Sequence, residues 1–462
     1  MSLRPPIALI LALVLLAALA AAGPESAVAR GPTVKASVRR ALLDGIITRD
    51  AHDSYRRLYD ESRSVRKRLS GARRAELHSV VATLERIADG RDLNAARMPV
   101  LFLLLERNTE FWRSRPFPAP GARLSLGRSP VIFQYYRGEG LQLQPLASFG
   151  KANALYNACV GNDVRPGVPC RREALRELLD AMVTLGVSRG GFIAWEYYFE
   201  FGGGRPPWIS GLAQGTAVQA LARGAELLGE PAYLEVGRSA LGAFERRPPV
   251  GVRVPADAGN HYLTYSFNPR LRVLNGFLQA VSGLHDFARA SSEPRALALF
   301  EAGDRAARQA VPRFDTGAWS LYASPGRESD LGYHRLVRDF LGNLCERTEA
   351  PVYCNSEQRF TRYLYEHPRL VLSSTRSGRA GRSLPIRFRL SKISRVSIRV
   401  TRGRRLAFFS RQTLGYGRRA FSFTPRARGR YQIRLEAADL RNHHRVVRGS
   451  FVVQRAQRPR RR

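Results

Sequence analysis

The sequence predicts a multidomain α+β protein with a mainly α-helical, α/α toroid-like domain followed by a C-terminal antiparallel β-sandwich. Up to Pro368, apolar residues recur at helical spacing in segments separated by aromatic-rich connections, which is typical of repeated helix pairs. Helical arrays without a cleft have the same periodicity. After Pro368, short segments alternate apolar and polar residues between glycine-containing turns, as the strands of a sandwich do. A length of 462 residues leaves room for both parts.

The first 29 residues are expected to form a signal peptide. Arg4 precedes an apolar run from Ile7 to Ala22 that is short for a membrane span and ends in small residues. Cleavage is expected after Ala22 or after Ala29, and an uncleaved anchor is the alternative. We therefore expect a secreted or cell-envelope protein.

Residues 30–115 are predicted to be a helical region. Leu42, Leu43, Ile46 and Ile47 repeat at helical spacing, and Ser70 is a candidate N-cap of a later helix. Proline, glycine and arginine then dominate 116–130, which indicates a linker or surface crossing.

The toroid-like domain is predicted to cover residues 116–368. Within it, 190–203 reads as an extended aromatic hairpin, and Tyr135 and Tyr136 are candidates for a sugar-stacking platform or for core packing. Helices are expected at 172–185, 232–245, 273–289, 295–311, 336–346 and 357–365, and a further one opens near Ser210.

Residues 369–455 resemble the Ig-like modules appended to secreted proteins, and residues 456–462 are expected to be a solvated basic tail. The whole chain is strongly basic. It has 75 Lys and Arg against 38 Asp and Glu, a net charge of +37. Such a surface attracts polyanions, although a general bias toward arginine explains the charge equally well.

Four cysteines fall into two close pairs, Cys159 with Cys170 and Cys345 with Cys354. In an oxidising compartment these pairs are the expected disulfides, while four cysteines allow three connectivities. No metal site is expected, since neither pair has C-x-x-C spacing with a histidine beside it.

Common hydrolase and nucleotide-binding motifs are absent from the sequence, so no cofactor is expected. Two carboxylate pairs remain open as glycosidase candidates, Glu196 with Glu200 and Glu328 with Asp330. Ordinary ion-pair roles explain them as well.

One stretch is a candidate display loop for chemistry. Residues Asp315 to Leu336, DTGAWSLYASPGRESDLGYHRL, place Tyr322 and Tyr333 in a segment rich in glycine, proline and serine between two helical patterns. Loops on a rigid scaffold often carry functional side chains, whereas a tyrosine in a loop is more often packing.

Four motifs around this stretch give it a more specific interpretation. They are PWISGLAQG at Pro207, VLNGFLQAVSGLHDF at Val273, FDTGAWSLY at Phe314 and GYHRL at Gly332. In this order and spacing, the segment from Gly190 to about Leu341 resembles the C-terminal domain of D-glucuronyl C5-epimerases. The resemblance implies an isomerase that converts glucuronate to iduronate in an acidic polysaccharide.

The resemblance also implies that Tyr265, Tyr322 and Tyr333 are the catalytic residues. Removal of H5, which is α to the uronate carboxylate, needs a base and stabilisation of the resulting charge. A tyrosine acting as that base needs cationic neighbours to lower its pKa. Candidates by sequence proximity are Arg270, Arg272, Arg335 and Arg338.

Substrate contacts are expected in or beside the same motifs, from Arg270, Asn275, Arg335, Trp208 and Gln214. The family usually has glutamate before the tyrosine that matches Tyr265, and this chain has Thr264. The expected partner is a uronate-containing polysaccharide; no nucleotide is expected, nucleic acid is not favoured, and a homodimer stays open. A lyase, a hydrolase or a non-catalytic polysaccharide-binding protein are the alternative functions.

Overall fold

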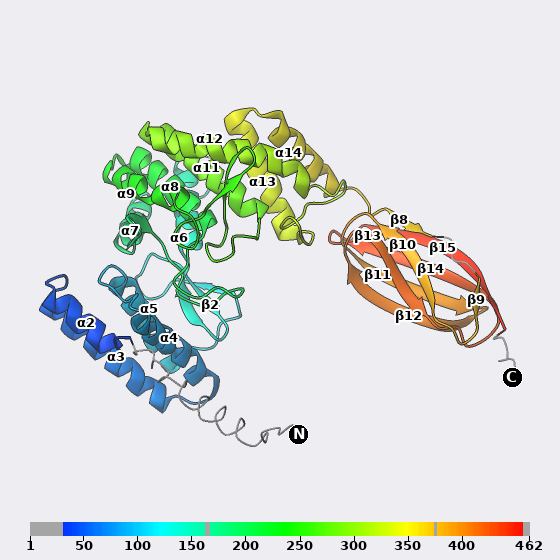
Figure 1. Cartoon of the computed structure of the whole chain (residues 1–462), viewed down its shortest axis with the longest axis horizontal. Coiled ribbons are helices and arrows are strands. Elements are labelled where there is room, and N and C mark those ends of the chain that lie inside the picture. Colours follow the sequence, from blue (N-terminus) through cyan, green and yellow to red (C-terminus); the bar gives the residue numbers. More distant parts are fainter. Residues whose placement is uncertain (1–30, 162–166, 374–376, 456–462) are drawn as a thin grey trace, which may run out of the picture.

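The computed structural model describes residues 31–161, 167–373 and 377–455 (Figure 1). Figure 1 shows an N-terminal group of helices, a larger helical region beside it, and two sheets near the C-terminal end. The expected signal peptide and basic tail lie outside the described residues. Within the described ranges, no helix combines the length and apolar character needed to cross a membrane.

Among the described residues, the N-terminal group consists of four helices: α2 Val34–Leu43, α3 Arg49–Arg68, α4 Gly71–Asp89 and α5 Met98–Ser114. Ser70 stands at the N-cap of α4, but its side chain makes no capping hydrogen bond. The apolar repeat at 42–47 does not form a buried helix face, because α2 ends at Leu43, and Leu43 and Ile46 are 70% and 63% exposed.

A small antiparallel sheet joins these helices to the next region. Its strands are β1 Arg123–Leu124, β2 Phe133–Tyr136 and β3 Gly140–Leu143. The buried carboxylate of Glu76 on α4 accepts hydrogen bonds from the N–H groups of Gly138 and Gly140 and from the Tyr135 hydroxyl. This carboxylate fixes the β2–β3 turn against α4.

Four helix pairs follow, and each pair has an inner and an outer helix. The pairs are α6 Pro145–Cys159 with α7 Arg172–Thr184, α8 Gly211–Leu228 with α9 Ala232–Ala240, α11 Leu274–Ser291 with α12 Pro294–Ala310, and α13 Leu331–Thr348 with α14 Pro351–Tyr363. The inner helices α6, α8, α11 and α13 pack in that order. Side chains from the C-terminal halves of all four line one pocket, so the inner helices run parallel.

Glycine makes the closest of these helix contacts possible. A Cβ atom on Gly215 of α8 would lie 2.5 Å from the Cα atom of Ala280 on α11. One on Gly283 of α11 would lie 2.0 Å from the carbonyl oxygen of Gly215. The two helix backbones therefore touch without side chains between them.

Short elements connect the pairs at the N-terminal ends of the inner helices. They are β4 Val187–Arg189, β5 Phe192–Ala194, α10 Gly242–Glu245, β6 Arg253–Ala256, β7 Gly259–Tyr262 and the 3₁₀ helix η2 Val311–Phe314. The hairpin predicted at 190–203 is displaced toward the N-terminus, since β4 begins at Val187. Its second half instead forms isolated bridges, Tyr197 with Trp208 and Phe201 with Gly204.

Both expected disulfides are present in the structure. Cys159 bonds to Cys170 and joins the end of α6 to the segment before α7. Cys345 bonds to Cys354 and joins α13 to α14. The first and the last helix pair of the array are therefore covalently closed.

The C-terminal region consists of two sheets around one apolar core. One sheet has the order β13 Gly417–Phe423, β10 Leu384–Leu390, β8 Leu370–Leu372; the other has β12 Arg405–Leu414, β11 Ser394–Arg402, β14 Gly429–Asp439, β15 His444–Gln454, β9 Gly378–Arg379. Alternating residues such as Val396, Ile398 and Val400 point into the core. The sandwich is not wholly antiparallel, because β9 pairs with β15 in parallel.

Candidate functional site

Three tyrosines from separate segments meet near the N-terminal ends of α11 and α13. The Oη atoms of Tyr265 and Tyr322 lie 3.4 Å apart, although the residues are 57 positions apart in the chain. The rings of Tyr322 and Tyr333 meet edge to face, with centroids 4.8 Å apart. Tyr322 thus contacts both others, and the structure brings together the three residues predicted to be catalytic.

Tyr265 is held by the segment that follows β7. The Ser266 N–H donates to the Ile209 carbonyl at 3.0 Å, and the Ile209 N–H donates to Ser266 Oγ at 3.1 Å. The Tyr265 ring packs on Trp208 and Phe267, with centroid distances of 5.9 and 5.5 Å. The start of α8 and an aromatic cluster therefore fix this ring.

Tyr322 lies in the loop between η2 and α13. Its N–H donates to the Arg327 carbonyl at 2.9 Å, and its own carbonyl accepts from the N–H of Leu274, the first residue of α11, at 3.3 Å. Beneath it, the indole of Trp319 stacks on His334 with centroids 3.6 Å apart. Contacts to both α11 and α13 therefore position the loop.

His334 supports this loop rather than supplying a base. Its Nε2 lies 2.9 Å from the carbonyl oxygen of Phe360, so Nε2 carries the proton, and Nδ1 accepts from Ser320 Oγ at 2.8 Å. The ring is fully buried, and burial lowers the pKa of His334 to about 4. At neutral pH it is an uncharged link between the loop, α13 and α14.

Tyr333 is on a helix, so the prediction that it lies in a loop is wrong. α13 begins at Leu331, and Asp330 Oδ1 accepts a hydrogen bond from the Tyr333 N–H at 2.8 Å. A carboxylate at the N-cap satisfies one of the unpaired N–H groups in the first helical turn. This cap starts the helix two residues before Tyr333, whose exposed ring contacts the ring of Tyr322.

Burial raises the pKa of all three tyrosines above the ordinary value. The contact with Tyr265 raises the pKa of Tyr322 further, and the charge of a Tyr322 phenolate adds to the increase at Tyr333. The positive charge of Arg327 opposes these effects at both residues without reversing them. The free protein therefore holds three neutral hydroxyls at neutral pH, and the cationic lowering expected from the sequence is not found there.

Arg327 is the site arginine that the sequence motifs miss. Its Cζ atom lies 5.6 Å from the centroid of the Tyr322 ring. The available signal was its position between Tyr322 and Tyr333 in the stretch singled out above.

The arginines selected by sequence proximity differ in their surroundings. Arg270 and Arg335 are exposed and have no side-chain hydrogen bond among the described residues, so both are free to bind a ligand. Arg272 donates to the Pro269 carbonyl, and Arg338 pairs with Asp339.

The other predicted substrate contacts are buried. Trp208 donates from Nε1 to the Phe199 carbonyl at 2.9 Å, and Gln214 is fully buried and donates to the Trp195 carbonyl at 3.0 Å. Asn275 is 3% exposed, and its Oδ1 has no hydrogen-bond partner among the described residues. In this structure the Trp208 ring packs against the Tyr265 ring, and Gln214 lies in the core.

Thr264 packs against the start of α11. A Cβ atom on Gly276 of α11 would lie 2.0 Å from Thr264 Oγ1, so the side chain packs on the first turn of this helix. Thr264 is buried, and its Oγ1 has no hydrogen-bond partner among the described residues. The position where the family usually has glutamate supplies no acid or base here.

The first candidate carboxylate pair is engaged in structural contacts. Glu196 is buried and pairs with Arg97 at 2.7 Å and with Arg189 at 2.5 Å. Burial raises the pKa of Glu196, but the two guanidinium groups outweigh burial and leave the pKa below its ordinary value. Glu200 pairs with Arg86 at 3.2 Å.

The second pair is engaged as well. Glu328 accepts backbone hydrogen bonds from the C-terminal sheets, and Asp330 caps α13. Neither pair stands free beside a cleft as a glycosidase requires.

Tyr322 and Tyr333 border a pocket, and a separate cavity lies between the inner helices. The pocket, of about 390 Å³, is lined by Tyr322, Tyr333 and residues of the C-terminal sheets. The cavity, of about 1000 Å³, extends along the inner helices, from Leu146 of α6 and Leu336 of α13 at the end near the tyrosines to Asn157 and Arg347 at the other end. The size of each is suited to sugar residues.

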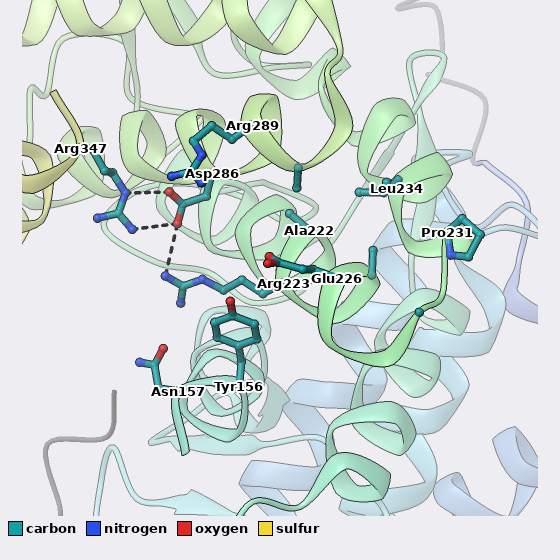
Figure 2. Close-up of a pocket in the computed structure, with 13 residues that line it drawn as sticks. Tyr156, Asn157, Ala222, Arg223, Glu226, Pro231, Leu234, Asp286, Arg289 and Arg347 are labelled. Carbon is teal, nitrogen blue, oxygen red and sulfur yellow. Dashed lines mark hydrogen bonds and ion pairs between the residues drawn. The ribbon is translucent and has the colours of Figure 1, made fainter. Parts of the chain in front are cut away.

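Figure 2 shows a further polar pocket, of about 800 Å³, at the C-terminal halves of the inner helices. Arg347 donates to Asp286 at 2.7 Å, and Arg223 pairs with the same carboxylate at 3.3 Å. Burial raises the pKa of Asp286, but hydrogen bonds from Arg347 and His285 outweigh burial and hold the pKa well below its usual range. Two guanidinium groups therefore share one carboxylate, and Arg289 also lines the pocket, so this end of the helices has an excess of positive charge.

Comparison with known proteins identifies the region that contains the tyrosines. Residues 189–362 match the family model described as D-glucuronyl C5-epimerase C-terminus. A D-glucuronyl C5-epimerase of Caenorhabditis elegans is 30% identical over 130 residues, which are 25% of this chain and 21% of that protein. An uncharacterized protein of Methanocaldococcus jannaschii is 27% identical over 169 residues, 35% of this chain and 55% of that protein. The chain thus spans about half of one relative and about a fifth of the other.

The alignments with solved structures are weak. An unsaturated glucuronyl hydrolase from Streptococcus agalactiae aligns with 64% of this chain and 70% of its own, at 14% identity and a TM-score of 0.35. A GH76 α-mannanase from Bacteroides thetaiotaomicron aligns with 66% of this chain and 82% of its own, at 10% identity and a TM-score of 0.37.

Proposed function

We propose that the protein inverts C5 of D-glucuronate residues in an acidic polysaccharide to give L-iduronate, because residues 189–362 match the family model described as D-glucuronyl C5-epimerase C-terminus. The observation that carries the proposal is the meeting of Tyr265, Tyr322 and Tyr333 within the matched region. These residues come from two connecting segments and one helix, and no element of secondary structure alone would bring them together.

The proposed reaction needs groups that tyrosine can supply. A tyrosinate removes H5 as a proton, and the electron pair of the C–H bond passes into the carboxylate to form an enediolate-like intermediate. Hydroxyl and guanidinium hydrogen bonds stabilise that charge. A neutral tyrosine hydroxyl then returns a proton to C5 from the opposite face, so the reaction needs no redox partner.

Tyr322 is the central member of the proposed set. It hydrogen bonds to Tyr265 and contacts the ring of Tyr333, so Tyr265 and Tyr333 are the candidates for the two faces of the sugar. The raised pKa values suit proton donors. The same values mean that the base must form its phenolate once substrate is bound, through the neighbouring hydroxyls and Arg327.

The remaining parts of the chain fit a secreted polysaccharide-modifying protein. The two disulfides support export from the reducing cytoplasm, and we propose that an N-terminal signal peptide directs it. The division at about residues 115 and 368, and the Ig-like character of 369–455, are likewise proposals.

Solvent exchange tests the function directly. The purified protein is incubated in deuterium oxide with a glucuronate–N-acetylglucosamine polymer and with a glucuronate–N-acetylgalactosamine polymer, followed by NMR of the sugars. We expect deuterium at C5 and iduronate signals in at least one polymer, with unchanged chain length. An unsaturated uronate would instead indicate a lyase, and new reducing ends would indicate a hydrolase. Unchanged, undeuterated polymers would leave only a binding function.

A further inference from the structure

The C-terminal sandwich is joined to the tyrosine loop through a buried carboxylate. Glu328 extends from this loop and is 6% exposed. Its Oε1 accepts from the Ile393 N–H at 2.8 Å, and its Oε2 accepts from the Tyr416 N–H at 2.7 Å. Both donors belong to the sandwich, one before β11 and the other between β12 and β13. The Glu328 side chain, six residues after Tyr322 in the chain, therefore binds two loops of the sandwich.

A buried lysine makes a second junction nearby. Lys392 is 1% exposed and pairs with Asp439 of the sandwich at 2.9 Å. It also donates to the carbonyls of Tyr363 and Glu366 at the end of α14 and lies 5.3 Å from the Trp319 ring centroid. Parting the two regions would keep the ion pair with Asp439 but would leave the buried ammonium without its two carbonyl acceptors, so the contact resists separation.

The Glu328 junction forms part of the wall of the pocket of about 390 Å³ beside Tyr322 and Tyr333. Tyr322, Arg327 and Tyr333 line one side, and Tyr416 and Arg419 of the sandwich line the other. Ligand pockets commonly have volumes of about 300–1000 Å³. The pocket therefore has the size of a single bound sugar residue.

The charged groups of this pocket favour an anion. Two guanidinium groups, Arg327 and Arg419, and two carboxylates, Glu328 and Asp330, line the pocket. Both guanidinium groups are exposed, whereas Glu328 is buried and accepts from backbone N–H groups and Asp330 Oδ1 accepts from the first turn of α13. Arg419 is held in place because its Nε and Nη2 donate to the carbonyls of Gly415 and Tyr416, both at 2.9 Å. Its Nη1 has no hydrogen-bond partner among the described residues and remains available to a carboxylate.

We propose that this pocket is a subsite for the acidic sugar that adjoins the reacting one, with Arg419 as a carboxylate ligand supplied by the sandwich. The pocket borders Tyr322 and Tyr333 but not Tyr265. The reacting uronate must reach all three tyrosines, so a sugar in the pocket is its neighbour along the chain. The exposed ring of Tyr416 offers a face on which that sugar can stack. The inference rests on the proposed function for the identity of the ligand.

Calorimetric binding of a glucuronate–N-acetylglucosamine octasaccharide to wild type, Arg419→Gln and Arg418→Gln tests the subsite. Arg418 precedes Arg419 on β13, is also exposed and does not line the pocket, so it is the matched control for charge. We expect Arg419→Gln to weaken binding about tenfold, as expected for loss of a hydrogen bond to a charged group, and Arg418→Gln to bind as wild type does. In the exchange assay, Arg419→Gln should raise KM and leave kcat nearly unchanged.

The outcomes separate this inference from the proposed function. If wild type exchanges C5 hydrogen and Arg419→Gln binds and reacts as wild type does, the subsite is overturned and the function stands. If wild type binds without exchange and Arg419→Gln weakens binding, the subsite stands and the function is overturned. Equal weakening by both arginine variants would show general charge attraction and overturn the subsite. Absence of binding to wild type would overturn the subsite, while exchange alone would still support the function.

Discussion

The hydroxyl of Tyr322 is the residue-scale feature on which the proposed chemistry depends most. Replacement by phenylalanine keeps the ring that packs on Tyr333 and removes the oxygen that lies 3.4 Å from Tyr265 Oη. We expect Tyr322→Phe to reduce C5 exchange by about 100-fold or more, the usual loss for a general acid–base group. Tyr365→Phe, which changes an exposed tyrosine at the end of α14, is the control. A Tyr322→Phe protein that exchanges at the wild-type rate would contradict the role.

The raised tyrosine pKa values predict how exchange depends on pH. While the pH is below the pKa of the base, each increase of one pH unit raises the fraction of phenolate about tenfold. For a pKa above 10, exchange should therefore rise steadily from pH 7 to 9. Because the folded pKa values exceed the unfolded value near 10, burial of neutral tyrosines stabilises the fold below about pH 10, and this stabilisation is lost above it. Rates measured by NMR at several pH values check this; a maximum near neutral pH would point to a different base.

At this scale the sequence motifs select three tyrosines that meet in the structure, but they do not predict what surrounds these tyrosines. Motif order selects Tyr265, Tyr322 and Tyr333 without any knowledge of distance. Proximity in the sequence cannot show that Arg327 lies over the Tyr322 ring. Nor can it show that burial outweighs positive charge, because burial depends on which segments cover the rings.

At the scale of elements, the start of α13 sets the position of Tyr333. Asp330→Ala removes the side chain that accepts from the Tyr333 N–H and should lower the free energy of unfolding by about 1 kcal/mol. The first helical turn should then fray, so exchange should fall more than stability alone explains. Asp330→Asn preserves the cap and serves as the control. Chemical denaturation and exchange rates together check this, and equal activity of the two variants would contradict a positioning role for the cap.

Element boundaries were less predictable than element types. The sequence indicates a helix beginning at Leu336, whereas α13 begins at Leu331, because Asp330 provides a cap inside a stretch rich in glycine and serine. At the other end of the chain, Leu43 and Ile46 follow a helical repeat but are exposed, since α2 ends there and no element covers them. Caps and neighbours decide such ends, and periodicity does not include them.

At the scale of the whole molecule, the disulfides close the two ends of the array of helix pairs. Helix α13 packs against the inner helix α11 on one side, and the disulfide between Cys345 and Cys354 links α13 to α14. Replacing both cysteines with serine should lower the free energy of unfolding by about 2–3 kcal/mol. Calorimetry checks this loss.

Activity separates the two ends. Loss of the Cys159–Cys170 bond should also reduce stability, but with a smaller effect on exchange near the melting temperature, because α6 carries no site tyrosine whereas α13 carries Tyr333. Equal losses of exchange from the two disulfide variants would contradict this difference.

The arrangement of the regions is the part that the sequence could least supply. The spacing of apolar residues changes from helical to alternating after Pro368, and this change separates a helical part from a strand-rich part. It gives no sign that Glu328 reaches Ile393 and Tyr416, or that Lys392 reaches the end of α14. These contacts join residues far apart in the sequence, and they turn an apparent appendage into one wall of a pocket.

The contact between Gly215 and Gly283 restricts how this protein can be redesigned. Any side chain at either position would meet backbone atoms of the other helix, so a substitution has to separate α8 from α11. Such a shift would move the segments at their N-terminal ends, which hold Tyr265 and the Tyr322 loop. In a mutational library these two positions should tolerate only glycine, while the loops and the sandwich surface accept variation. Changes of substrate preference can therefore be sought at the rim of the site, with the helix centre kept constant.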